Sequence, residues 1–389
     1  MKRLMCLVVA ALLALPLLVS SAALPESAAV TKGADFIRTT QVEDGGFGGF
    51  GPGQSMDAIF ALRAAGVDPA TVKRDGKSPA DFLAANASGA TTAGAAAKAA
   101  LAAKAMNLDP RNLAGVDLVA TIQAAFDGDK YADDDFTHSI AILGLACTGN
   151  DIPGGAVMRL RETQLADGGW GFEGASDPDT SAIAAQALIA AGVPNDDPDV
   201  LAAIAYFKAK QGNDGGWGFS PDESNTSSTA FVVQALLALG EKPEAAEYTR
   251  SGKTAVAYLV SKQLPDGSFE GFDPAYAANQ VVPALAGRTF CNAVTTSLAP
   301  ASPSPATASA TASSTATVTP SASATASTTA SKTATIARTA TPRSPRVGSG
   351  QSNDGPGGGT AALLAVAGGV LMLTAAGGIA AATIGRRRR

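Results

Sequence analysis

The fold is decided by a stretch that recurs along the chain, Gln164-Leu165-Ala166-Asp167-Gly168-Gly169-Trp170-Gly171-Phe172. Its Asp-Gly-Gly core lets the backbone turn through positive φ without a Cβ clash, so the aromatic residue can fold back on neighbouring helices. The repeated glutamines and aromatic residues are Gln41, Gln123, Gln164, Trp170, Gln211, Trp217, Gln263 and Phe269. Copies of one such unit predict an array in which each helical pair buries its face against its neighbours.

The segments around each copy complete the repeat. Polar-faced helices are expected before the glutamines, over 201–210 and 254–262, and helices of small and apolar residues after the glycines, from 179 and 225 onward. The five glutamines lie 82, 41, 47 and 52 residues apart. The longest gap is two periods and holds a degenerate copy, with helices expected over 78–87 and 91–106. The sequence therefore predicts six repeats and about twelve helices.

The motif Gln-x-x-Asp-Gly-Gly-Trp-Gly-Phe, followed by the helix that starts Asp179-Thr180-Ser181-Ala182, resembles the repeat of the terpenoid cyclase and protein prenyltransferase superfamily. The similarity covers roughly residues 30–290. It implies an all-α fold, the α/α toroid, with inner and outer rings of helices. One fold hosts many activities, so the repeat by itself predicts architecture and not chemistry.

The two ends of the chain have different compositions from the repeats. Residues 1–23 read as a secretory signal and 24–299 as the toroid domain. Residues 300–359 are rich in Ser, Thr, Ala and Pro and predict a disordered linker. Residues 360–385 carry no charge and predict one transmembrane helix, with the arginines of 386–389 as a cytoplasmic tail. This order predicts a single-pass membrane protein that displays its toroid outside the cell.

The charge of the toroid domain limits its partners, and its two cysteines limit its disulfides. Between residues 24 and 299 there are 19 basic and 33 acidic side chains, an excess that argues against a nucleic-acid partner. Cys147 and Cys291 remain after the signal. In an oxidising compartment they predict one disulfide, with two buried free thiols as the alternative.

The sequence assigns no catalytic residue. A class II terpenoid cyclase uses an Asp-x-Asp-Asp acid, whereas residues 177–180 read Asp-Pro-Asp-Thr. The zinc site of prenyl transfer needs Asp, Cys and His together, and His138 is the only histidine. The Gly-Cys-Gly-Glu-Gln string of thioester proteins is absent. A cyclase-like or polysaccharide-active enzyme stays open as the alternative, because two facing carboxylates are not excluded.

Ligand binding is the preferred interpretation and depends on a second resemblance. Residues 279–290 and 136–147 are similar to stretches of the cobalamin carriers intrinsic factor and transcobalamin. This implies a non-catalytic binding module for a cobalamin-like or other small ligand, or for another surface protein. The carriers close over their ligand with a second, β-rich domain, which the linker replaces here. The positions implied at the starts of inner helices are Thr137, His138, Asp179, Asn225 and Gln280.

A weak calcium candidate lies between the repeats. Asp127, Asp129 and Asp133 alternate as oxygen ligands do, but the loop lacks the central glycine and terminal glutamate of an EF-hand. No other metal site is expected.

Overall fold

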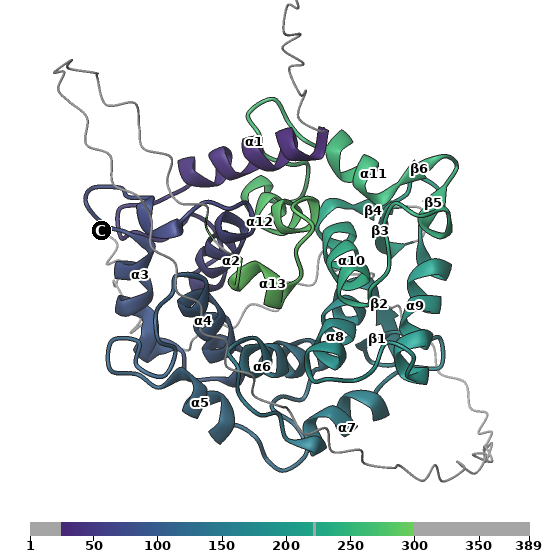
Figure 1. The fold of residues 1–389 in the computed structure, drawn as a ribbon, viewed down its shortest axis with the longest axis horizontal. Helices are drawn as coiled ribbons and strands as arrows, with labels where there is room; N and C mark the ends of the chain where they lie inside the picture. Colours follow the sequence, from purple (N-terminus) through teal and green to yellow (C-terminus); the bar gives the residue numbers. More distant parts are fainter. Residues whose placement is uncertain (1–24, 221–222, 297, 299–389) are drawn as a thin grey trace, which may run out of the picture. The chain divides into compact units, whose positions relative to one another are not determined.

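The computed structural model describes residues 25–220, 223–296 and 298, and they form two concentric rings of helices (Figure 1). The inner ring consists of α2 (Pro52–Ala64), α4 (Ala93–Ala105), α6 (Asp135–Cys147), α8 (Pro178–Ala190), α10 (Thr226–Ala238) and α12 (Pro274–Leu285). The outer ring consists of α1 (Pro25–Thr39), α3 (Pro79–Asn86), α5 (Leu118–Ala124), α7 (Gly154–Glu162), α9 (Pro198–Lys210) and α11 (Ala255–Ser261). Each inner helix packs on the next, and α12 packs on α2, so the ring closes. The predicted α/α toroid is confirmed.

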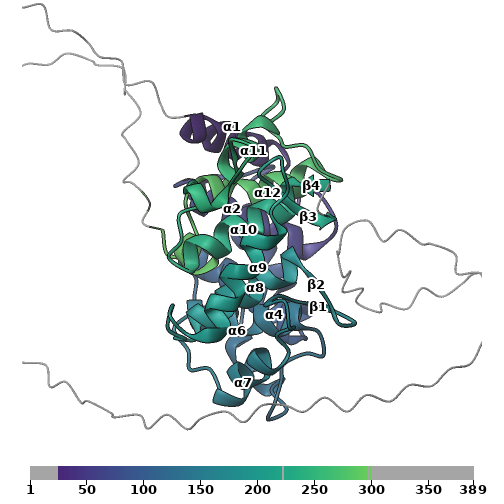
Figure 2. The same cartoon turned by 90° about the vertical axis from the view of Figure 1, so that its right-hand side faces the viewer.

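Short strands and turns join the helices. The strand β1 (Trp170–Phe172) pairs with β2 (Ala175–Asp177), β3 (Trp217–Ser220) with β4 (Glu223–Asn225), and β5 (Thr249–Arg250) with β6 (Lys253–Thr254). Three single turns of 3-10 helix cover Pro69–Thr71, Ala87–Gly89 and Ala246–Tyr248. In the side view the first two strand pairs lie on the same side of the ring (Figure 2). The strands are hairpins of two to four residues per strand and leave the fold class all-α.

The repeated glutamines Gln164 and Gln211 each link their repeat to the segment that follows. The Nε2 group of Gln164 donates to the carbonyl of Gly168 at 2.9 Å and to that of Asp199, at the start of α9, at 2.8 Å. Gln211 makes the equivalent pair of bonds with Gly215 and Tyr248, at 2.8 and 2.7 Å. One amide therefore satisfies both a glycine turn and the entry to the following outer helix.

The repeated tryptophan anchors the same loop. Trp170 is fully buried, its Nε1 donates to the carbonyl of Leu160 at 2.7 Å, and its backbone N–H donates to the Ser181 hydroxyl at 2.8 Å. Trp217 repeats this geometry with Phe207 and Thr229. Each loop is thus tied to the outer helix before it and to the inner helix after it.

Gly168 tests the packing of this loop, with Gly174 as a matched control. Both have positive φ, +90° and +80°, but a Cβ on Gly168 would collide with the carbonyl of Ala202, whereas Gly174 faces open space. Gly174→Ala should cost only the backbone strain of about 1–2 kcal/mol. Gly168→Ala should cost clearly more of the free energy of unfolding, measured with urea. Equal losses would show that the close approach to α9 is unimportant.

A thirteenth α-helix among the described residues lies inside the ring, and the sequence did not predict it. Helix α13 (Phe290–Val294) follows α12 and packs against α2, α4 and α6 (Figure 1). A disulfide joins Cys291 of α13 to Cys147 at the end of α6. The centre of the toroid is therefore occupied by the chain itself.

Four predicted segments lie outside the described residues: the signal (1–23), the linker (300–359), the transmembrane helix (360–385) and the tail (386–389). None of the described helices has both the length and the apolar character needed to cross a bilayer.

Candidate functional site

The inner helices begin with polar side chains that cap them. Oδ1 of Asp134 accepts from the backbone N–H of Thr137 at 2.7 Å, and Oδ1 of Asn225 accepts from that of Ser228 at 2.8 Å. Asp177 and Asp273 cap α8 and α12 in the same way. These side chains are committed to the orphan N–H groups of the helix ends, which stabilises the helices.

Two of the predicted ligand positions face neighbouring helices. The methyl group of Thr137 points at Gly94 of α4. His138 is 1% exposed, its Nδ1 accepts from the backbone N–H of Tyr131 at 3.1 Å, and its Nε2 lies 2.9 Å from the carbonyl of Ala156 in the outer helix α7. Burial lowers the pKa of His138, so the imidazole is neutral at pH 7 and serves to join the two rings.

Asp179 has a different environment from the capping carboxylates. It lies in the first turn of α8, its Oδ1 is shielded from solvent, and that oxygen has no hydrogen-bond partner. Burial raises the pKa of Asp179 to about 7, the charge of Asp177 adds to this, and a hydrogen bond with the Ser228 hydroxyl opposes it. A carboxyl group in this state is a protonated acid over much of the neutral range.

Asp57 and Lys98 form an ion pair inside the inner ring. Nζ of Lys98, on α4, lies 2.8 Å from Oδ1 and 2.9 Å from Oδ2 of Asp57, on α2. Asp57 is 6% exposed; its burial raises the pKa, while the charge of Lys98 and hydrogen bonds from Lys98 and Gln280 lower it. The predicted position Gln280 therefore lies at the lumen, in contact with a carboxylate that the sequence analysis did not select.

Tyr276, on α12, is close enough to both carboxyl groups for their charges to act on it. Burial raises its pKa, and the charges of Asp57 and Asp179 raise it further, so both act on the same phenol. Its ring is 6.1 Å from that of Phe272, which is exposed and stacks on Phe50 at 5.2 Å. Phe50, Phe272 and Tyr276 thus form a row of neighbouring aromatic rings that begins at the surface.

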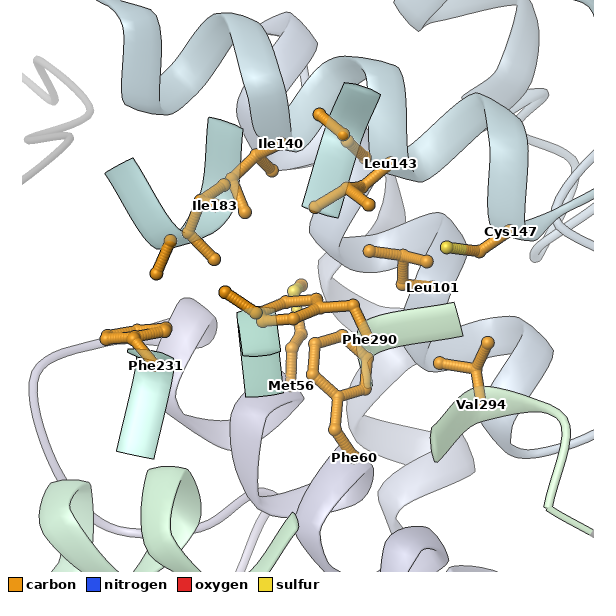
Figure 3. Close-up of a cluster of buried hydrophobic side chains, with 14 of the residues drawn as sticks. Met56, Phe60, Leu101, Ile140, Leu143, Cys147, Ile183, Phe231, Phe290 and Val294 are labelled. Carbon is orange, nitrogen blue, oxygen red and sulfur yellow. The ribbon is translucent and has the colours of Figure 1, made fainter. Parts of the chain in front are cut away.

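Most of the remaining side chains that face α13 are apolar. Large side chains from α2, α4, α6, α8 and α10 point inward around α13 (Figure 3). They are Met56, Phe60, Leu101, Ile140, Leu143, Ile183 and Phe231. With α13 in place, the space left beside Asp57, Gln280 and Phe290 is about 10 Å³. That volume holds roughly one water molecule.

The calcium candidate forms a turn with its own hydrogen bonds. Oδ1 of Asp127 accepts from the backbone N–H groups of Asp129 and Lys130, at 2.9 and 2.8 Å. Asp133 pairs with Lys130 at 2.7 Å. Within the described residues, no group of three or more His, Cys, Asp or Glu side chains is placed to hold a metal ion.

The lumen contains polar residues that sequence reasoning missed. The sequence analysis did not select Asp57, Lys98 or Tyr276, although the sequence around the first two contained a signal. Asp57 interrupts an apolar inner helix, and Lys98 stands in the alanine run of α4. A charged residue in a helix buried on most sides indicates a partner within the ring.

Comparison with known proteins identifies the fold. No protein-family model and no curated protein match the sequence. The chain shares the α/α toroid fold with type II terpene cyclases. It is similar to the type II terpene cyclase MstE from Scytonema without ligand, with 16% identity and a TM-score of 0.50 over 67% of this chain and 98% of that one.

Two further structures extend the comparison. A variant of MstE in complex with its substrate, geranylgeranyl dihydroxybenzoate, has 17% identity and a TM-score of 0.51 over 68% of this chain and 97% of that one. A glycosidase in complex with glucose has 14% identity and a TM-score of 0.47, over 67% and 96%.

These comparisons correct the functional prediction. The expected non-catalytic module for a cobalamin-like ligand is wrong, because the solved structures that share the toroid along nearly their whole length are enzymes. The prediction failed because it relied on two short stretches, 279–290 and 136–147. In the structure these are the inner helices α12 and α6 with the segment that leads into α13, and their residues serve the packing of the ring.

Proposed function

We propose that the toroid is an acid-catalysed enzyme that acts on an apolar substrate containing alkenes, of the polyprenoid class, with Asp179 as the proton donor. The observation that carries this proposal is the buried, unpartnered Oδ1 of Asp179, with a pKa of about 7, on a ring whose interior is lined by apolar side chains. An alkene is a weak base, so its protonation needs a carboxylic acid that keeps its proton and is shielded from water.

The reaction step follows from this geometry. The proton of Asp179 adds to one carbon of an alkene, the π electrons form the new C–H bond, and a carbocation remains on the other carbon. Ring closure by a second alkene moves the positive charge to a new carbon, and water takes a proton from the neighbouring carbon to give an isomer of the substrate. The protonated water then returns one proton to the Asp179 carboxylate. Aromatic faces such as those of Phe60 and Phe231 stabilise a passing cation.

Asp177 supports the proposed acid in two ways. Asp177 stays occupied as the cap of α8, and its charge keeps the proton on Asp179. The two carboxyl groups therefore have different roles: Asp177 stabilises the helix, and Asp179 is the acid. The structural neighbour MstE supports the substrate class, since its substrate carries a geranylgeranyl chain.

The test is turnover in deuterated water. The protein is incubated with geranylgeranyl arenes and linear polyprenols, once with its Cys147–Cys291 disulfide intact and once after the disulfide is reduced. The products are analysed by mass spectrometry. We expect cyclised isomers of the substrate that carry one deuterium bonded to carbon, delivered by the deuterated carboxyl group of Asp179. Hydrolysis of glycans, or no isomerisation in either redox state, would refute the proposal.

A further inference from the structure

Helix α13 fills the space that a substrate of the toroid would need. The Phe290 ring lies 6.1 Å from that of Phe60, edge to face, and Val294 lies between the inner helices (Figure 3). Phe290 and Ala293 also face the small cavity beside Asp57 and Gln280. The segment therefore occupies the position of a ligand, with its apolar side chains against the apolar lining.

The polar contacts of α13 with the ring are few. The backbone N–H of Phe290 donates to Oε1 of Gln186, on α8, at 3.2 Å. Nε2 of the same Gln186 is buried and has no hydrogen-bond partner. An amide that is only half satisfied by the chain is suited to a different occupant with a carbonyl or hydroxyl group, since a buried unpaired donor costs free energy.

The disulfide is the strongest link between α13 and the ring. A helix of five residues is too short to be stable by itself. The bond from Cys291 to Cys147 holds it against α6, so ordering the segment costs less entropy than it would in a free tail. Cys147 is buried and Cys291 only partly so, which leaves the bond open to attack from the side of Cys291.

We propose that α13 is a redox-controlled plug of the lumen, closed by the Cys147–Cys291 disulfide and opened when a dithiol reduces it. The dithiol gives two electrons and two protons, becomes a disulfide itself, and leaves two thiols on the chain. Released from α6, the segment leaves the apolar lining, and a substrate replaces it. The plug concerns access to the site of the proposed function, but its test requires no turnover.

The experiment measures binding of the apolar fluorescent probe N-phenyl-1-naphthylamine to the full chain, before and after treatment with dithiothreitol. Reduction should tighten apparent binding by at least about tenfold, because apparent affinity scales with the fraction of open molecules. Cys291→Ser should bind the probe as the reduced protein does, without reductant. Thr295→Ala, an exposed change just after α13 that keeps the disulfide, should behave as the oxidised wild type.

Hydrogen exchange followed by mass spectrometry separates opening from unfolding. Release of the plug predicts faster exchange at 289–296 on reduction, with unchanged exchange in α6. Faster exchange in both segments would mean that the disulfide holds the ring together, and unchanged exchange at 289–296 would mean that α13 stays bound; either result overturns the plug. Probe uptake without polyprenoid turnover would leave the plug standing and refute the proposed enzyme, and turnover without any redox effect would do the reverse.

Discussion

Asp179→Asn is expected to lower turnover of a polyprenoid by about 10²–10⁴-fold, because it removes the proton donor and keeps its shape. The pH dependence follows from the pKa of about 7: the rate should fall as pH rises through that value, where the acid loses its proton. The control is Asp177→Asn, since asparagine also caps helices and the change removes only a neighbouring charge. It should retain activity and move the alkaline fall in rate to lower pH.

Stability provides a readout of Asp179 that does not depend on knowing the substrate. Its pKa is raised in the folded state, so the carboxyl contributes stability that is fully present below the ordinary value of 3.8 and is lost as pH rises through about 7. Each unit of pKa difference corresponds to about 1.4 kcal/mol. Wild type should therefore melt at a lower temperature at pH 8 than at pH 5, and Asp179→Asn should lose part of that difference. An identical pH dependence in the variant would mean that Asp179 is an ordinary exposed carboxylate.

Lys98→Met is expected to lower the free energy of unfolding by about 3–5 kcal/mol at pH 8, because it leaves the Asp57 carboxylate buried without its cation. The loss should be smaller at low pH, where Asp57 takes up a proton. The double variant with Asp57→Asn should recover much of the stability, since the unpaired charge is then gone. Urea unfolding at pH 5 and 8 measures all three chains. A loss below about 1 kcal/mol would place the pair among ordinary surface ion pairs.

The repeat could be predicted because its signal is local. Gln164, the glycine turn and Trp170 lie within one loop, and the copy that begins at Gln211 carries the same bonds, so spacing alone gave the twelve helices of the two rings. The sequence also singled out Asp179, whose Oδ1 is buried without a partner, and Gln280, which lines the small cavity beside Asp57. Helix α13 could not be predicted in the same way: Phe290–Val294 has no periodicity of its own and is ordered only by the ring around it.

The acidic site depended on contacts that sequence spacing does not contain. Asp57 and Lys98 are 41 residues apart and meet only because α2 and α4 are neighbours in the inner ring. His138 shows the opposite error, because its place near a helix start suggested a ligand, whereas its ring faces the outer helix α7. No single repeat determines which side of an inner helix faces the lumen. The closure of the ring determines it.

The closure of the ring also determines when the domain can finish folding during synthesis. Nε2 of Gln263 donates to the carbonyl of Ala29 at 2.8 Å, so the last glycine loop holds the first helix as the loops of Gln164 and Gln211 hold the segments that follow them. A linear repeat array needs specialised end units to protect its exposed faces, whereas here the two ends protect each other. Helix α12 follows this loop and packs on both α1 and α2. A chain emerging during synthesis therefore lacks the partners of its first helix until α12 has been made, and the toroid cannot reach its final stability before then.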